Sequence, residues 1–137
     1  MIDVIHDQSH CQAAKDPEVS ATIAQMLARV GDKWSMLMVR TLGFGPLRFN
    51  ELRRQIGDIS QKVLSSTLKA LERDGLVSRT VIPSVPPQVV YELTDLGREL
   101  LIPVIAIIGW TIDNTDRIVA ARQTYDAQRL TTTTLDI

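Results

Sequence analysis

The sequence predicts a mainly α-helical domain that carries one small β-hairpin. Apolar residues recur at helical spacing through most of the 137-residue chain, and two short alternating segments flank a proline-rich loop. The order is short helix, turn, second helix and hairpin, followed by a long apolar helix. We therefore expect a winged helix-turn-helix that dimerises through its terminal helices.

Length and composition favour one folded domain. The hydrophobic content of 45% is ample for a packed core. A single cysteine excludes an intramolecular disulfide, and the first residues lack the features of a signal peptide, so we expect a cytoplasmic protein. The longest apolar run, residues 100–110, is far shorter than the roughly 20 residues of a membrane helix, and no membrane partner is expected.

The chain divides into four predicted segments. Residues 1–18 form a tail or short helix, residues 19–98 the winged core, residues 99–125 a dimerisation helix and residues 126–137 a flexible tail. The net charge is −1, but residues 33–98 hold ten basic and six acidic residues. Such a basic central block can face phosphates.

Three helices are expected before the main helix of the core. They cover Glu18–Val30, Lys33–Leu42 and a short stretch from about Arg48 to Ile56. Gly31 and Asp32 end the first helix and cap the second.

The segment Gln61–Asp74, capped by Ser60, is predicted to be a recognition helix. Leu64, Leu68 and Leu71 form one buried stripe. Cationic and hydroxyl side chains fall largely opposite, at roughly 140° to 200° around the helix, with Ser65 nearer 100°. The candidate DNA contacts on this helix are Gln61, Lys62, Ser65, Ser66, Lys69 and Arg73. Lysine can meet phosphates or guanine acceptors, and a short serine lets a helix approach base edges. The alternative is an ordinary solvated face.

A β-hairpin follows this helix and is predicted to form the wing. Gly75 ends the helix in a left-handed conformation, and strands are expected over Leu76–Ile82 and Val89–Leu93. Prolines stiffen the loop, whose tip can lie along a backbone or a minor groove. Further candidate DNA contacts are Arg48, Arg79, Ser84 and Gln88. The alternative is a hairpin that only closes the core.

The terminal helix, capped by Thr94 and Asp95, is too apolar for a monomer. We expect it to pair with a second copy, so that the dimer binds a palindromic operator in double-stranded DNA. The predicted interface residues are Val104, Ile107, Ile108 and Thr111. Pro103 is expected to kink this helix or to begin its second half.

Several ordered blocks of the chain carry a family resemblance. They include Val30–Trp34, Gly45–Leu52, Ile59–Leu64, Leu71–Arg79 and Val85–Thr94. From about residue 11 to residue 110 the sequence resembles the bacterial HxlR-type (DUF24) winged-helix regulators. The resemblance implies a dimeric transcription regulator without catalytic activity, and we expect a repressor.

Many members of that family have a cysteine shortly before the first helix, and some sense quinones, aldehydes, hypochlorite or disulfide stress through it. Cys11 matches this position. Only its thiolate attacks an electrophile, and Lys15 or His10 could favour ionisation whereas Asp7 and Asp16 would oppose it. The alternative is an unreactive cysteine.

A rival input is a small ligand bound reversibly between the terminal helices and the winged core. The residues that could line such a pocket are Met26, Trp34, Met38, Phe44 and Trp110. At these spacings the same residues also suit a plain core.

Other classes of function have less support. No phosphate loop, nucleophile elbow or framed acid and base pair is present, which argues against an enzyme. His6, His10 and Cys11 lack a fourth ligand at a recognised spacing, so no metal or other cofactor is expected. A winged helix used only for protein contacts remains an alternative, and the salt dependence of binding distinguishes it from a DNA-binding one.

Overall fold

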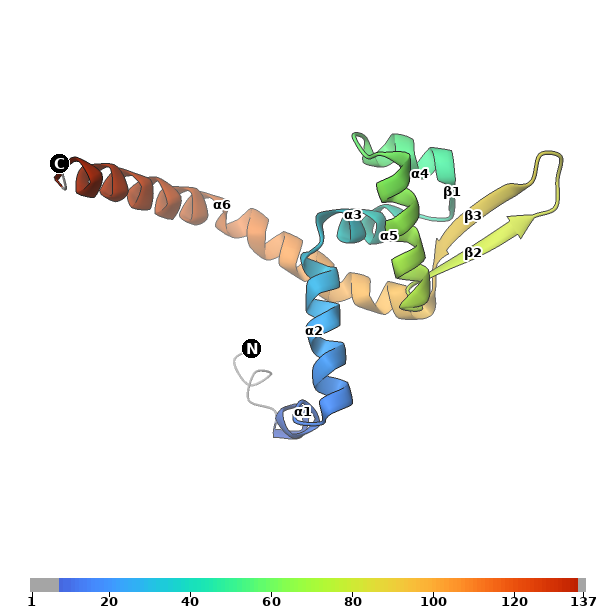
Figure 1. Ribbon diagram of the computed structural model, residues 1–137, viewed down its shortest axis with the longest axis horizontal. Coiled ribbons are helices and arrows are strands. Elements are labelled where there is room, and N and C mark those ends of the chain that lie inside the picture. Colours follow the sequence, from blue (N-terminus) through green and yellow to red (C-terminus); the bar gives the residue numbers. More distant parts are fainter. Residues whose placement is uncertain (1–7, 136–137) are drawn as a thin grey trace. The chain divides into compact units, whose positions relative to one another are not determined.

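The computed structural model describes the backbone of residues 8–135 and the side chains through residue 131. The chain (Figure 1) consists of two compact units, of which the first ends at Leu101 and the second begins at Ile102. The elements in chain order are α1 (Gln8–Ala13), α2 (Pro17–Gly31), α3 (Lys33–Leu42), β1 (Leu47–Arg48), α4 (Phe49–Ile56), α5 (Gln61–Arg73), β2 (Val77–Ile82), β3 (Gln88–Leu93) and α6 (Asp95–Leu135). This order confirms the predicted mainly α-helical fold with a small β-hairpin.

The sheet has three antiparallel strands in the order β1–β3–β2. In the hairpin, Val77 pairs with Leu93 and Ile82 with Gln88. The sequence predicted the hairpin but not β1, because two residues are too few to show an alternating pattern. β1 pairs Arg48 with Val90 and so brings the start of α4 beside the base of the wing.

One aspartate organises the junction between α2 and α3, as the sequence predicted. The Asp32 backbone N–H donates to the Arg29 carbonyl at 3.2 Å and closes α2. Its carboxylate accepts hydrogen bonds from the Ser35 backbone N–H at 2.9 Å and from the Ser35 hydroxyl at 2.5 Å. Ser35 is fully buried, so its hydroxyl is satisfied where an unpaired one would be costly.

The core of the first unit is built around the buried face of α5. Leu64, Leu68 and Leu71 are buried as predicted. They belong to one cluster with residues of α3, α4, the sheet and the intervening links: Met38, Val39, Leu42, Leu52, Ile59, Leu76, Val77, Tyr91 and Leu93. Because one face of α5 is committed to this cluster, the opposite face is held toward solvent.

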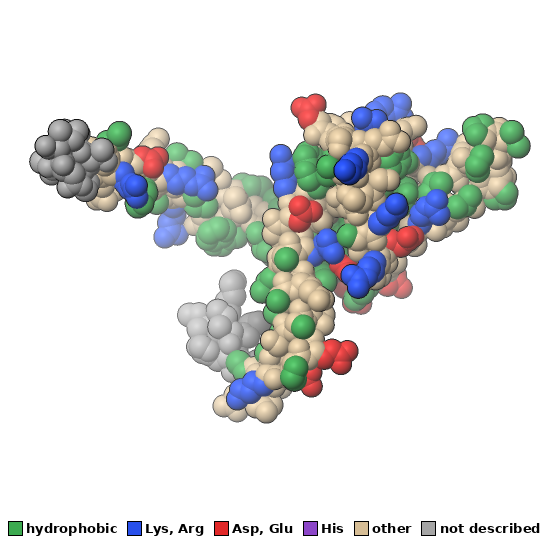
Figure 2. Space-filling model, viewed as in Figure 1, with side chains coloured by type: hydrophobic (Ala, Val, Ile, Leu, Met, Phe, Trp, Pro, Cys, Tyr) green, Lys and Arg blue, Asp and Glu red, His purple; other side chains and the backbone are tan. Residues whose placement is uncertain are grey.

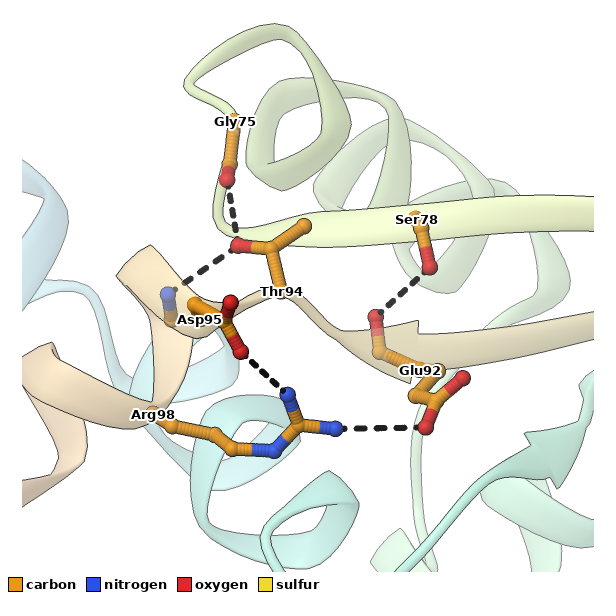
Figure 3. A network of polar contacts seen from close by, with 7 residues as sticks. Gly75, Ser78, Glu92, Thr94, Asp95 and Arg98 are labelled. Carbon is orange, nitrogen blue, oxygen red and sulfur yellow. Dashed lines mark hydrogen bonds and ion pairs between the residues drawn. The ribbon is translucent and has the colours of Figure 1, made fainter.

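A polar network joins the end of α5, the sheet and the start of α6 (Figure 3). The Thr94 hydroxyl donates to the Gly75 carbonyl at 2.6 Å and accepts from the Gly97 backbone N–H at 3.1 Å. Arg98 reaches Glu92 at 3.2 Å and Asp95 at 3.1 Å. Gly75 has a φ of +77°, the left-handed conformation expected for a glycine that ends a helix.

Helix α6 is longer than the sequence predicted. The expectation of a frayed tail from residue 126 is wrong for the described residues, because the helix continues to Leu135. Good helix formers in residues 127–130 extend an existing helix at little cost. Pro103 lies inside one continuous helix and does not begin a second one. None of the helices among the described residues is long and apolar enough to cross a membrane.

The close approach of α6 to Leu76 makes Gly97 a sensitive position. A methyl group added there would meet the Leu76 carbonyl oxygen at 2.2 Å, and that atom is backbone. We expect Gly97→Ala to lower the free energy of unfolding by about 1 to 3 kcal/mol, despite the higher helix propensity of alanine. The matched control is Gly31→Ala, whose added methyl meets no atom within 4 Å. Equal denaturation midpoints for the two variants would contradict this constraint.

Candidate nucleic-acid interface

Helix α5 presents a polar and cationic face to solvent. The Ser60 hydroxyl accepts from the Val63 backbone N–H at 3.1 Å and fixes where the helix begins. Of the six predicted contacts on this helix, Ser65 is half-buried and the others are exposed: Gln61, Lys62, Ser66, Lys69 and Arg73. The Ser66 hydroxyl donates to the Val63 carbonyl at 3.1 Å, which leaves its oxygen free to accept.

The cations on this face are not neutralised by neighbouring acids. Among the described residues, no carboxylate forms an ion pair with Lys62, Lys69 or Arg73. Figure 2 shows lysine and arginine side chains gathered over the first unit, around α4, α5 and the base of the wing. Such a surface attracts a polyanion.

The wing differs in chemistry from α5. Arg79 on β2 is exposed, but residues 80–97 contain no lysine or arginine. Val85 at the loop tip is fully exposed. The Ser84 hydroxyl donates to the Pro86 carbonyl at 2.7 Å, so it helps to hold the loop rather than standing free as a donor. The wing tip therefore offers mainly apolar contacts.

A cleft of about 780 Å³ lies where α4 meets the start of β3. Its lining residues are Arg48, Phe49, Asn50, Glu51, Arg54, Pro87, Gln88 and Val89. The structure thus brings together Arg48 and Gln88, which the sequence predicted as separate contacts. Asn50 and Arg54 were not predicted, because only the β1–β3 pairing places α4 beside the wing.

An ion pair connects α2 to the end of α5. Arg29 Nε lies 2.8 Å from the Asp74 carboxylate, and the two side chains are only 27% and 22% exposed. Asp74 is also the residue that caps the C-terminus of α5. The orientation of α2 is therefore linked directly to the end of the predicted recognition helix.

The predicted sensor, Cys11, lies on α1 with an exposed thiol. His10 beside it is also exposed, whereas His6 lies outside the described residues. Among the residues that the structure describes, no three histidine, cysteine or acidic side chains gather in a way that could hold a metal ion.

The five residues of the predicted ligand pocket have different surroundings. Met38 is fully buried in the core, and Met26 and Trp34 pack against it. Phe44 is 89% exposed, and Trp110 belongs to the second unit. The first three therefore serve the core.

The predicted dimer residues on α6 also differ in exposure. Val104 is buried and Ile108 half-buried, whereas Ile107 and Thr111 are exposed. A further exposed stripe consists of Ile105, Ile112 and Val119, which recur every seven residues. The predicted interface did not include this stripe, although its spacing is visible in the sequence.

Taken together, these features define a class of protein. A helix with a buried leucine stripe and a cationic outer face follows a shorter helix and precedes a β-hairpin, which is a winged helix-turn-helix. The model of the HxlR-like helix-turn-helix family matches residues 29–119. The chain belongs to this family, whose members are DNA-binding transcriptional regulators.

Individual relatives agree with this assignment. The helix-turn-helix-type transcriptional regulator YtfH of Escherichia coli (strain K12) is 40% identical over 98 residues, covering 72% of this chain and 78% of YtfH. The solved structure of the transcriptional regulator YtfH of Salmonella typhimurium matches with a TM-score of 0.66 at 38% identity, over 73% of this chain and 89% of that one. The solved structure of the redox regulator HypR in its reduced form matches with a TM-score of 0.67 at 36% identity, over 72% of this chain and 98% of that one.

Proposed function

We propose that this protein is a homodimeric regulator that inserts α5 into the major groove of a palindromic operator and responds to electrophiles or oxidants through Cys11. The observation that carries the DNA-binding part is the outer face of α5, where Lys62, Lys69 and Arg73 are exposed and have no acidic partner among the described residues. Acid–base pairs along a helix would stabilise an ordinary solvated face, and these three cations form none among the described residues.

The geometry of α5 suits insertion into DNA. Its leucine stripe is buried, so rotation about the helix axis is fixed by the core. Lys62 and Lys69 are seven residues apart and therefore lie about two turns apart on the same side. The small Ser66 lies between them and allows the backbone to approach base edges, while each lysine reaches a phosphate or a guanine acceptor.

Replacing Lys62 or Lys69 by alanine tests this assignment. Each variant should weaken binding to a duplex selected by the wild-type protein by about 1 to 3 kcal/mol if a base is read, or flatten the salt dependence if a phosphate is contacted. Binding is measured by fluorescence anisotropy over a range of KCl concentrations. Arg117→Ala on α6 removes the same charge and should leave binding unchanged. Wild-type affinity and salt slope in both lysine variants would remove α5 from the interface.

The exposed apolar side chains of α6 support a dimer. Ile105, Ile112 and Val119 form a stripe at the seven-residue spacing of paired helices. An apolar stripe of this length is costly in water and becomes favourable when a second copy covers it. Two-fold symmetry would also present two copies of α5 to successive major grooves.

Ile112→Asp should convert the dimer to a monomer. Ile112 is 70% exposed in the single chain, so the new charge does not disturb a monomer core but would be buried unpaired in a dimer. Ala121→Asp is the matched control, since Ala121 is exposed and lies about 180° around the helix. Sedimentation velocity distinguishes the two species. An Ile112→Asp variant that sediments as a dimer would contradict an α6 interface.

Two observations support Cys11 as the chemical input. Its thiol is exposed and therefore accessible to a small reagent, and the similar protein HypR is described as a redox regulator. Attack of the thiolate on a quinone forms a carbon–sulfur bond, and the electron pair moves to the quinone oxygen, which is then protonated. From α1 a change can pass along α2 to the Arg29–Asp74 ion pair and so to α5.

The response of Cys11→Ser to a quinone and to a mild oxidant tests the sensor. The wild-type protein should lose operator affinity by about tenfold or more after treatment, within the usual range of allosteric coupling. Cys11→Ser should bind the operator equally well before and after treatment. An equal loss in both proteins would exclude Cys11 and favour a ligand pocket instead.

A further inference from the structure

We propose that the cleft between α4 and the base of the wing is a binding site for a phosphate of the DNA backbone, with Arg54 as its principal cation and Asn50 as a second contact. This inference rests on the proposed DNA-binding function. It adds a site apart from α5 that determines where the sugar–phosphate strand runs.

The cleft is produced by the pairing of β1 with β3. Arg48 pairs with Val90, so the first turn of α4 lies against the start of β3, where Pro87, Gln88 and Val89 form the opposite wall. Its volume of about 780 Å³ is large compared with a single phosphate group. A continuous strand that passes through the cleft fits this size better than an isolated anion.

The charges within the cleft leave one cation unpaired. The Glu51 carboxylate accepts from the Arg48 backbone N–H at 3.1 Å and lies 3.9 Å from Arg48 Nε. Arg48 therefore offsets the only acidic group in the lining. Arg54 has no ion-pair partner among the described residues. A free guanidinium in a polar cleft is suited to bidentate contact with a phosphodiester.

The position of the cleft points to DNA as the occupant. One wall belongs to the wing, and the other belongs to α4, which a short link joins to α5. Arg53 on α4 braces that link by donating from Nε to the Ile59 carbonyl at 3.4 Å. A strand in the cleft would thus run between the two elements that contact the duplex, and it would supply the phosphate contact that the cation-free wing tip lacks.

Two substitutions separate a phosphate contact from a structural role. Arg54→Gln removes the cation but keeps a long polar side chain. Asn50→Asp places a carboxylate at the second residue of α4, where a negative charge stabilises a helix. The same carboxylate would repel a phosphate in the cleft. Arg117→Gln is the matched control, because it removes the same charge from α6, at a residue outside the cleft lining.

The experiment measures the affinity of each full-length variant for a duplex selected by the wild-type protein, as a function of KCl concentration. Arg54→Gln should reduce the slope of log affinity against log salt by about 0.9 for each cleft engaged. Asn50→Asp should bind more weakly than wild type while its thermal stability is unchanged or higher. Arg117→Gln should keep the wild-type slope.

The results distinguish a failure of the cleft proposal from a failure of the proposed DNA-binding function. A steep wild-type slope that persists in Arg54→Gln, or that falls equally in Arg117→Gln, overturns the cleft and leaves the DNA-binding function standing. Wild-type affinity in Asn50→Asp also overturns it. If the wild-type protein itself binds no duplex, the proposed function fails, and the cleft fails with it.

Discussion

The burial of Leu64, Leu68 and Leu71 is the constraint on which the rest of the structure depends. These three side chains commit one face of α5 to a core shared with α3, α4 and the sheet. Because that face is buried, the lysines on the opposite side of the helix are exposed to solvent. The orientation of the proposed DNA-binding surface is therefore a consequence of core packing, and a loss of packing would disturb that orientation.

Several contacts also fix the C-terminal end of α5. Gly75 turns the chain, and the Thr94 hydroxyl donates to the Gly75 carbonyl (Figure 3). Gly97 allows α6 to approach the Leu76 backbone closely. On the other side, Arg29 ties α2 to Asp74. The C-terminal end of α5 is thus the place where α2, the wing and the start of α6 come together. A shift in any one of them can alter the orientation of α5, the proposed recognition helix.

Local signals in the sequence were enough to predict most of the fold. The leucine stripe, the Asp32 and Ser60 caps and the glycine at position 75 each depend on neighbours along the chain, and each was confirmed. Features created by distant pairing were not visible. β1 exists only because Leu47 and Arg48 pair with β3, the cleft exists only because of β1, and the Arg29–Asp74 ion pair joins residues that are 45 positions apart. The extent of α6 was not predicted because the threonines near its end have modest helix propensity by themselves, whereas extending a formed helix costs little.

Chemical protection of guanine N7 tests whether α5 enters the major groove, because this atom lies in that groove. A duplex selected by the protein is treated with dimethyl sulfate with and without the protein bound. If the two copies of α5 in a dimer enter successive major grooves, two protected clusters should appear about one helical turn apart, roughly 34 Å. Selection of no sequence, or protection that leaves every guanine N7 reactive, would contradict it.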